Sequence, residues 1–249
     1  MSSTIQLMFM DIGALSHEQL EHSLLPDLHA AEQARYRNFT HPQRRRTWLA
    51  GRALLLASLA RHLEHVEPGA LRTDPRGAVR YDDCGLHLSL SHSRELLVAA
   101  VSQVPVGVDI ESRQARTLIE RGAQVFSDAE TGYLRELSGL ARVQAFYALW
   151  TLKEAACKLT GVSLWESLRS TCFDLVNGGV RLYAPFSSEA LSFMIAGIEP
   201  GWQLALAMRA SATAPRIGCW RMSAPQQWHS QTLDAQRFLH ALPSQPVSY

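Results

Sequence analysis

The sequence has little net charge, few cysteines and no long apolar run. Its 24 basic and 23 acidic residues leave a formal charge of +1, which argues against bulk attraction to nucleic acid or to an anionic membrane. No stretch is long and apolar enough to span a bilayer, and the first residues lack the basic and apolar regions of a secretory signal. We expect a cytoplasmic protein with no nucleic-acid or membrane partner, and any basic site must be local.

The cysteines show no metal-ligand or redox spacing. Four are present and none forms a C-x-x-C pair, so free thiols in a reducing compartment are predicted. The G-x-S-x-G motif of α/β-hydrolases is also missing. These absences disfavour a zinc site, a dithiol redox centre and a hydrolase of that class.

The apolar patterning predicts a mixture of helices and strands. A chain of 249 residues can form one large domain or two small lobes. Strands are predicted at 4–12, 85–93, 95–102, 105–111 and in several segments of 171–209. Helices are predicted at 17–37, from 42 onward, and at 116–126, 127–137 and 142–161. This mixture of helices and strands predicts an α+β fold. Helices and strands occur together in 1–105 and again in 106–210, which suggests two pseudo-duplicated lobes, although the sequence shows no clean residue-level repeat. Residues 211–249 are expected to form a C-terminal tail.

Several helix ends have sequence signals. Thr40 and Gln43 fit a capping box around Pro42, and Ser127 with Glu130 fits another. Gly161 is expected to end the long helix, because glycine readily adopts the left-handed conformation found there.

The stretch "VGVDIES" places Asp109 and Glu111 two positions apart. In a strand, such residues project to the same side. Two close carboxylates repel each other unless a cation lies between them, and Mg²⁺ prefers oxygen ligands of this kind. The alternative is a strand end with two solvated acids.

Two further motifs carry polar groups. In "WTLKEAACKLTG", Trp150, Glu154 and Lys158 share one helix face; they form either a surface ion pair or a carboxylate and a phosphate-binding cation beside a metal. "LSLSHS" ends a strand with Ser91 and His92, which form either an anion-binding turn or a purely structural group.

In combination these motifs are much more specific. "LSLSHS", "VGVDIE", "FSDAE" and "WTLKEAACKLTG" occur in this order, and the set resembles the Sfp-type 4′-phosphopantetheinyl transferase superfamily. The resemblance covers most of residues 35–175, including the arginine-rich "RRRTWLAGRALL". It implies transfer of the phosphopantetheine arm of coenzyme A to a serine hydroxyl of a carrier protein, with release of adenosine 3′,5′-bisphosphate. It also implies an active site in the cleft between two α+β lobes.

The resemblance assigns roles to individual residues. Asp109, Glu111 and Glu154 would be the Mg²⁺ ligands, with Glu154 also the general base. Lys158 would contact phosphate oxygens and stabilise the transition state, and His92, with Ser91 beside it, would bind the pyrophosphate.

The arginine-rich helix is expected to hold the other end of coenzyme A. Arg46 and Thr47 resemble the family's pair near the 3′-phosphate and adenine. Arg35 and Arg52 are further candidates. Arg44 and Arg45 either contact the coenzyme as well or form a solvated helix face. The family's Gly-Lys-Pro segment is replaced here by "GAV" at 77–79. The missing lysine puts the strength of coenzyme binding in question, and Arg76 and Arg80 are possible substitutes for its charge.

The expected partner is an apo acyl or peptidyl carrier protein. Such carriers are usually acidic, so Arg113, Arg116 and Arg121 could steer one by complementary charge. The two-lobe design implies a monomer. The alternative function is a non-catalytic module that binds coenzyme A or a carrier protein, and its support is the altered "GAV" segment.

Overall fold

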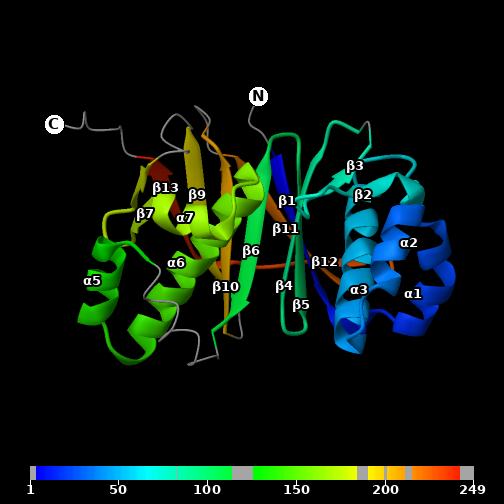
Figure 1. The fold of residues 1–249 in the computed structure, drawn as a ribbon, viewed down its shortest axis with the longest axis horizontal. Coiled ribbons are helices and arrows are strands. Elements are labelled where there is room, and N and C mark those ends of the chain that lie inside the picture. Colours follow the sequence, from blue (N-terminus) through cyan, green and yellow to red (C-terminus); the bar gives the residue numbers. More distant parts are fainter. Residues whose placement is uncertain are drawn as a thin grey trace. The chain divides into compact units, whose positions relative to one another are not determined.

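The computed structural model describes residues 4–82, 84–113, 126–183, 190–198, 201–210 and 215–241. The chain divides into two compact units. The first contains Met1–Val106 and Thr213–Thr232, and the second contains Gly107–Ala212 and Leu233–Tyr249. Both combine helices with a β-sheet (Figure 1), so the predicted α+β class is confirmed. None of the helices in the described ranges is long and apolar enough to cross a membrane.

The sheet of the first unit has the strand order β12-β11-β1-β5-β4. Its members are β1 (Thr4–Asp11), β4 (His87–Ser93), β5 (Leu96–Ser102), β11 (Arg216–Ala224) and β12 (Gln227–Ser230). The central strand β1 pairs antiparallel with β5 and parallel with β11. Apolar residues therefore fill β1 on both faces, and Ile5, Leu7, Met8, Phe9 and Met10 are all fully buried.

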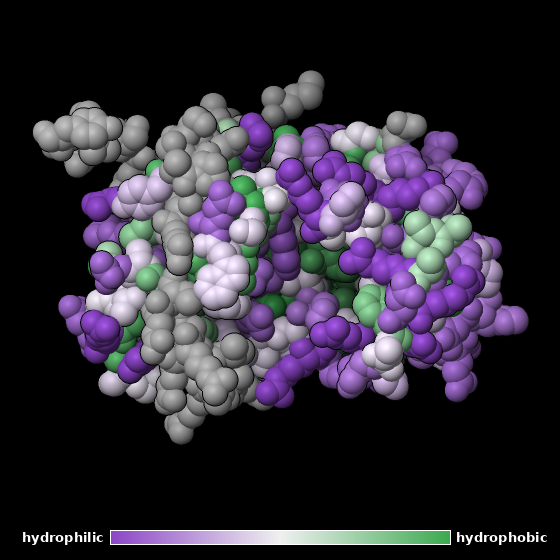
Figure 2. All heavy atoms as spheres, viewed as in Figure 1, coloured by the Kyte–Doolittle hydropathy of each residue, from purple (hydrophilic) through white to green (hydrophobic). Residues whose placement is uncertain are grey.

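Three helices belong to this unit: α1 (His17–Ser23), α2 (Ala30–Arg37) and α3 (Pro42–Leu59). Leu54, Leu55 and Leu59 of α3 pack with Met8, Met10 and Leu97 of the sheet in one core cluster. Short 3₁₀ turns occur at Ile12–Ala14, Leu25–Asp27 and Pro68–Ala70, and β2 (Leu71–Thr73) pairs with β3 (Val79–Tyr81). The helical side of this unit shows mostly hydrophilic side chains in Figure 2.

The sheet of the second unit has the order β6-β10-β9-β13-β8-β7. These strands are β6 (Val106–Ser112), β7 (Thr171–Asp174), β8 (Gly179–Leu182), β9 (Leu191–Ile198), β10 (Trp202–Arg209) and β13 (Asp234–Ala241). The helices are α5 (Asp128–Glu136), α6 (Gly139–Thr160) and α7 (Leu164–Ser170). Helix α6 packs on β10 and β9, and Leu149, Leu152, Ala155 and Ala156 of α6 are fully buried.

The structure confirms several sequence predictions and corrects others. Ser127 and Glu130 form the predicted capping box, and Gly161 ends α6 with a φ of 71°. The N-cap of α3 is His41, whose side chain accepts from the Gln43 N–H, rather than Thr40. The helical region 17–37 is interrupted near Pro26, because proline interrupts the helical hydrogen-bond ladder.

The expected C-terminal tail is organised differently from the prediction. It supplies β11 and β12 to the first sheet and inserts β13 between β9 and β8 of the second. The helix α7 and the β2–β3 pair were also not predicted. The predicted helix 116–126 lies almost wholly outside the described residues, as do Arg116 and Arg121.

Candidate active site

Helix α6 crosses strand β6 at very close range, and Gly107 makes this possible. A Cβ atom at position 107 would lie 2.1 Å from the carbonyl oxygen of Ala155 and 2.6 Å from the amide nitrogen of Leu159. Both are backbone atoms, so only glycine allows the helix to approach this closely. The crossing brings the residues that follow Gly107 on the strand next to the last two turns of α6.

The contact formed there joins an acid of the strand to a base of the helix. Asp109 is buried, and its Oδ1 accepts a hydrogen bond from the Lys158 Nζ at 2.8 Å. Glu111 projects to the same side of β6, two positions on, and is partly exposed. The structure therefore places Lys158 in direct contact with Asp109, a pairing that the sequence did not predict.

Glu154 lies one helical turn before Lys158 and also interacts with Asp109. Its pKa is raised above the usual glutamate value, first by burial and then by the negative charge of Asp109, while Lys158 opposes the shift. A half-buried carboxylate whose pKa is raised holds a proton more readily than a solvated one. Such a group suits proton transfer near neutral pH.

The same residues offer hard oxygen donors to a cation. Mg²⁺ is commonly bound through one or two carboxylates, with phosphate oxygens and water completing its shell. The mutual repulsion of Asp109 and Glu154 fits this donor chemistry, because a divalent ion would offset it. Within the described ranges, however, no three His, Cys, Asp or Glu side chains gather closely enough to form a metal cluster. The fit is therefore to a two-carboxylate site, with Glu111 in a neighbouring position.

A buried ion pair fixes α6 beside this site. Lys153, directly before Glu154, is fully buried, and its Nζ lies 3.0 Å from Oε2 of the buried Glu130. The Nζ also donates to the carbonyl oxygens of Leu168 and Thr171. Glu130 accepts further hydrogen bonds from the backbone N–H groups of Ser127 and Phe173.

Both charged groups of this pair thus make further hydrogen bonds, which is the condition under which a buried ion pair is tolerated. The pair links α5, α6 and β7 and so fixes the rotation of α6 about its axis. We did not predict this role from the sequence. The signal that could have revealed it is the presence of both residues in the motifs "FSDAE" and "WTLKEA".

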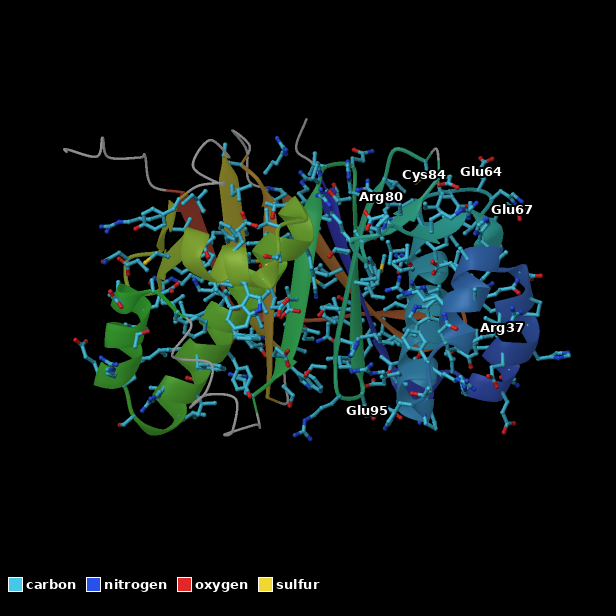
Figure 3. All side chains as sticks on the ribbon, viewed as in Figure 1. Arg37, Glu64, Glu67, Arg80, Cys84 and Glu95 are labelled. Atoms are coloured by element: carbon cyan, nitrogen blue, oxygen red, sulfur yellow. The ribbon has the colours of Figure 1, made fainter. Side chains whose placement is uncertain are left out.

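The first unit contains a basic pocket of about 880 Å³ between α2, α3 and the β4–β5 turn. Four arginines and one carboxylate line it, together with His92. The charged lining residues are Arg35, Arg44, Arg52, Arg94 and Glu95. Figure 3 shows Glu95 at the β4–β5 turn, where it accepts from the Gln43 side chain. Such a positive lining suits a phosphorylated ligand.

The pocket contains some of the predicted coenzyme contacts and not others. Arg35, Thr47, Arg52 and His92 line it. Arg46 does not; its Nη2 lies 3.6 Å from the position that a Cβ on Gly13 would take. Ser91 is buried and alternates with His92 along β4, so it also stays outside the lining.

Arg52 is held by other residues of the protein. Its guanidinium donates to Glu32 Oε2 from two nitrogens, at 3.0 and 2.9 Å, and to the Thr73 hydroxyl at 2.6 Å. It also lies 4.1 Å from the Trp48 ring centroid. Only 4% of Arg52 is exposed. This residue therefore stabilises the pocket wall through its contacts within the protein, and its guanidinium is not available to bind a ligand.

Arg94 is a lining residue that the sequence did not single out, and Arg44 is one for which the sequence left coenzyme contact and a solvated face both open. Helical spacing from Thr47 could have indicated Arg44, which is exposed. Arg94 adopts a positive φ of 49° in the β4–β5 turn, which no motif revealed. The candidate replacements for the missing lysine do not reach the pocket: neither Arg76 nor Arg80 lines it, and Arg80 pairs with Asp74 at 3.3 Å.

Comparison with known families gives two matches that together cover most of the chain. Residues 105–207 match the 4′-phosphopantetheinyl transferase superfamily. Residues 31–102 match the 4′-phosphopantetheinyl transferase N-terminal domain. The boundary between the two matches falls close to the division between the two structural units at Val106 and Gly107.

Individual relatives agree with these matches. The 4′-phosphopantetheinyl transferase psf-1 of Bacillus pumilus is 32% identical over 178 residues, which cover 68% of this chain and 75% of the relative. The 4′-phosphopantetheinyl transferase HetI of Nostoc sp. is 34% identical over 146 residues, covering 55% of this chain and 61% of HetI. The 4′-phosphopantetheinyl transferase gsp of Aneurinibacillus migulanus is 35% identical over 92 residues, covering 37% of this chain and 38% of gsp. The matches to HetI and gsp thus span less than two thirds of those relatives.

Proposed function

Because the chain belongs to the 4′-phosphopantetheinyl transferase superfamily, we propose that it transfers 4′-phosphopantetheine from coenzyme A to a serine hydroxyl of an apo acyl or peptidyl carrier protein. The serine oxygen attacks the phosphorus next to pantetheine, and adenosine 3′,5′-bisphosphate leaves. The observation that carries the proposal is the α6–β6 crossing at Gly107, which places Lys158 and Glu154 beside Asp109.

Glu154 is the proposed general base. A serine hydroxyl is a poor nucleophile at neutral pH, and a carboxylate positioned beside it can take its proton as the attack proceeds. The raised pKa of Glu154 makes it a stronger proton acceptor than an ordinary glutamate. Its position on α6 is fixed by the neighbouring Lys153–Glu130 pair.

Lys158 and Asp109 supply the charge arrangement around the diphosphate. Lys158 is partly exposed, with 28% of its side chain accessible, so its ammonium group can exchange Asp109 for a phosphate oxygen of the substrate. A cation placed there stabilises negative charge that develops on the leaving group. This assignment follows the motif resemblance and rests on the 2.8 Å contact with Asp109.

We also propose Mg²⁺ as the metal, held by Asp109 and Glu154, with Glu111 in a neighbouring position on the same side of β6. The support is the all-oxygen donor set and the repulsion that raises the pKa of Glu154. When bound, the ion would supply positive charge to the diphosphate in the transition state.

The basic pocket of the first unit is the proposed site for the 3′-phosphate end of coenzyme A. Arg44 and Arg35 are exposed, line the pocket and can offer guanidinium groups to a phosphate monoester. Thr47 and His92 are further lining groups from α3 and β4. Arg46 is a weaker candidate than Arg44 because it lies outside the lining.

The direct test is incubation of the protein with coenzyme A, Mg²⁺ and a panel of apo carrier proteins, followed by intact mass measurement. Transfer adds about 340 Da to a carrier, and EDTA should abolish the addition. If no carrier gains mass although coenzyme A binds, the chain is a non-catalytic binding module and the proposal fails. A monomeric state, a cytoplasmic location and charge steering of the carrier by Arg113 stay predictions.

A further inference from the structure

The first unit contains a second cavity, of about 790 Å³, which the proposed function does not use. It lies between α1, the C-terminal half of α3 and the β11–β12 hairpin, and it shares no lining residue with the basic pocket. Its size falls within the range of small-molecule sites. Much of the lining is apolar and includes Leu20, Leu24, Leu56, Met222, Pro225 and Trp228.

Helix α3 supplies one face to each cavity. Thr47, Trp48 and Arg52 line the basic pocket, whereas positions 53, 56, 57, 60 and 61 line the second cavity. The latter set follows the i, i+3, i+4, i+7, i+8 spacing of a single helix face, with Ala60 and Arg61 directly after the last residue of α3. Three members of this set are alanines, namely Ala53, Ala57 and Ala60, whose small side chains leave the space open.

One cation lies at this cavity beside two indole rings. The Arg61 guanidinium lies 4.4 Å from the Trp220 ring centroid and 5.4 Å from that of Trp228. Stacking on indole rings orients the guanidinium and leaves its N–H edge available for hydrogen bonds. Among the residues that the structure describes, no carboxylate lies within ion-pair distance of Arg61.

We propose that this cavity binds an amphipathic monocarboxylate, with its alkyl chain against the leucines of α1 and α3 and its carboxylate on Arg61. A guanidinium fork matches the two oxygens of a carboxylate. A single cation beside an apolar lining suits one small anionic head on an apolar tail better than a multiply charged phosphate. Asp27 is the other charged lining residue, exposed at the end of the Leu25–Asp27 turn, and it disfavours highly charged anions.

The site is tested on the full chain by isothermal titration with sodium decanoate below its micelle concentration. We expect saturable binding of one decanoate per chain, and weaker binding of decanol. Arg61→Gln should weaken decanoate binding about tenfold and leave decanol binding unchanged. Because Arg61 is exposed, this substitution leaves the fold intact.

Two further variants complete the test. Arg37→Gln, at an exposed arginine of α2 outside the cavity (Figure 3), is the matched control and should bind decanoate like the wild type. Ala57→Trp fills the cavity and should abolish binding of both ligands. The proposal is overturned if decanoate shows no saturable binding, if Arg61→Gln binds it as tightly as the wild type, or if decyltrimethylammonium binds better than decanoate, which would point to Asp27.

Discussion

Replacing Gly107 by alanine tests the structural basis of the site. The added Cβ would lie 2.1 Å from the Ala155 carbonyl oxygen, whereas ordinary contacts begin near 3.4 Å. The helix and strand must therefore separate by about 1.3 Å to restore an ordinary contact distance. Overpacking of this kind typically costs about 1–3 kcal/mol of unfolding free energy, and the upper end applies here because both obstructing atoms belong to the backbone.

The same displacement should reduce turnover more than stability alone would explain. A shift of about 1 Å between catalytic groups can reduce a rate on the order of 100-fold. Urea unfolding measures the first effect and carrier mass addition measures the second. Gly132→Ala in α5 is the matched control: a Cβ there meets nothing within 4 Å, so it should stabilise the helix by about 0.5–1 kcal/mol and leave turnover unchanged. Wild-type stability and turnover for Gly107→Ala would refute the reasoning.

Three further predictions follow from the buried charges and the basic pocket. Lys153→Met leaves Glu130 without its partner and should lower the unfolding free energy by about 3–5 kcal/mol, measured by urea unfolding. In EDTA, the wild type should lose stability relative to Glu154→Gln as pH rises through the raised pKa of Glu154. A raised carboxyl pKa favours the folded state only while the carboxyl group is protonated. Thermal unfolding at a series of pH values measures this loss. Arg44→Gln should raise the KM for coenzyme A about tenfold, whereas Arg46→Gln should leave it nearly unchanged.

Each of these predictions has a control. The double variant Glu130→Gln with Lys153→Met should recover part of the stability lost in the single variant. Adding Mg²⁺ at neutral pH should stabilise the wild type and not Glu154→Gln; an equal effect on both would contradict the proposed metal ligands. The Arg44→Gln effect should shrink with 3′-dephospho-coenzyme A, and an undiminished effect would show that Arg44 does not contact the 3′-phosphate.

The parts of the fold that could be predicted are those with strong local signals. Alternation predicted β4, short apolar runs predicted β5 and β6, and a long helical segment ending at a glycine predicted α6. The β11, β12 and β13 strands lie in a region with weaker patterning, and their pairing depends on partners far away in the sequence. Sequence periodicity contains no information about such long-range pairing, so the insertion of β13 between β9 and β8 could not be foreseen.

The order of the motifs along the chain was enough to predict which residues belong to the candidate site. Asp109 and Lys158 were singled out because both belong to motifs of one family, whereas the direct contact between their side chains was not predicted. The preference for Arg44 over Arg46 was not predicted. The two residues lie two positions apart on α3 and therefore face different directions, and the sequence alone did not show which direction faces the pocket. The buried role of Arg52 also depends on Glu32 and Thr73, which reach it from other elements.

The most direct test of the account compares Glu154→Gln with Glu136→Gln, a substitution at an exposed glutamate of α5, in the carrier assay with saturating coenzyme A and Mg²⁺. The account predicts complete addition of about 340 Da by the wild type and Glu136→Gln, and none by Glu154→Gln within the same time. Near-normal addition by a folded Glu154→Gln variant would contradict the claim that this carboxylate carries the transfer.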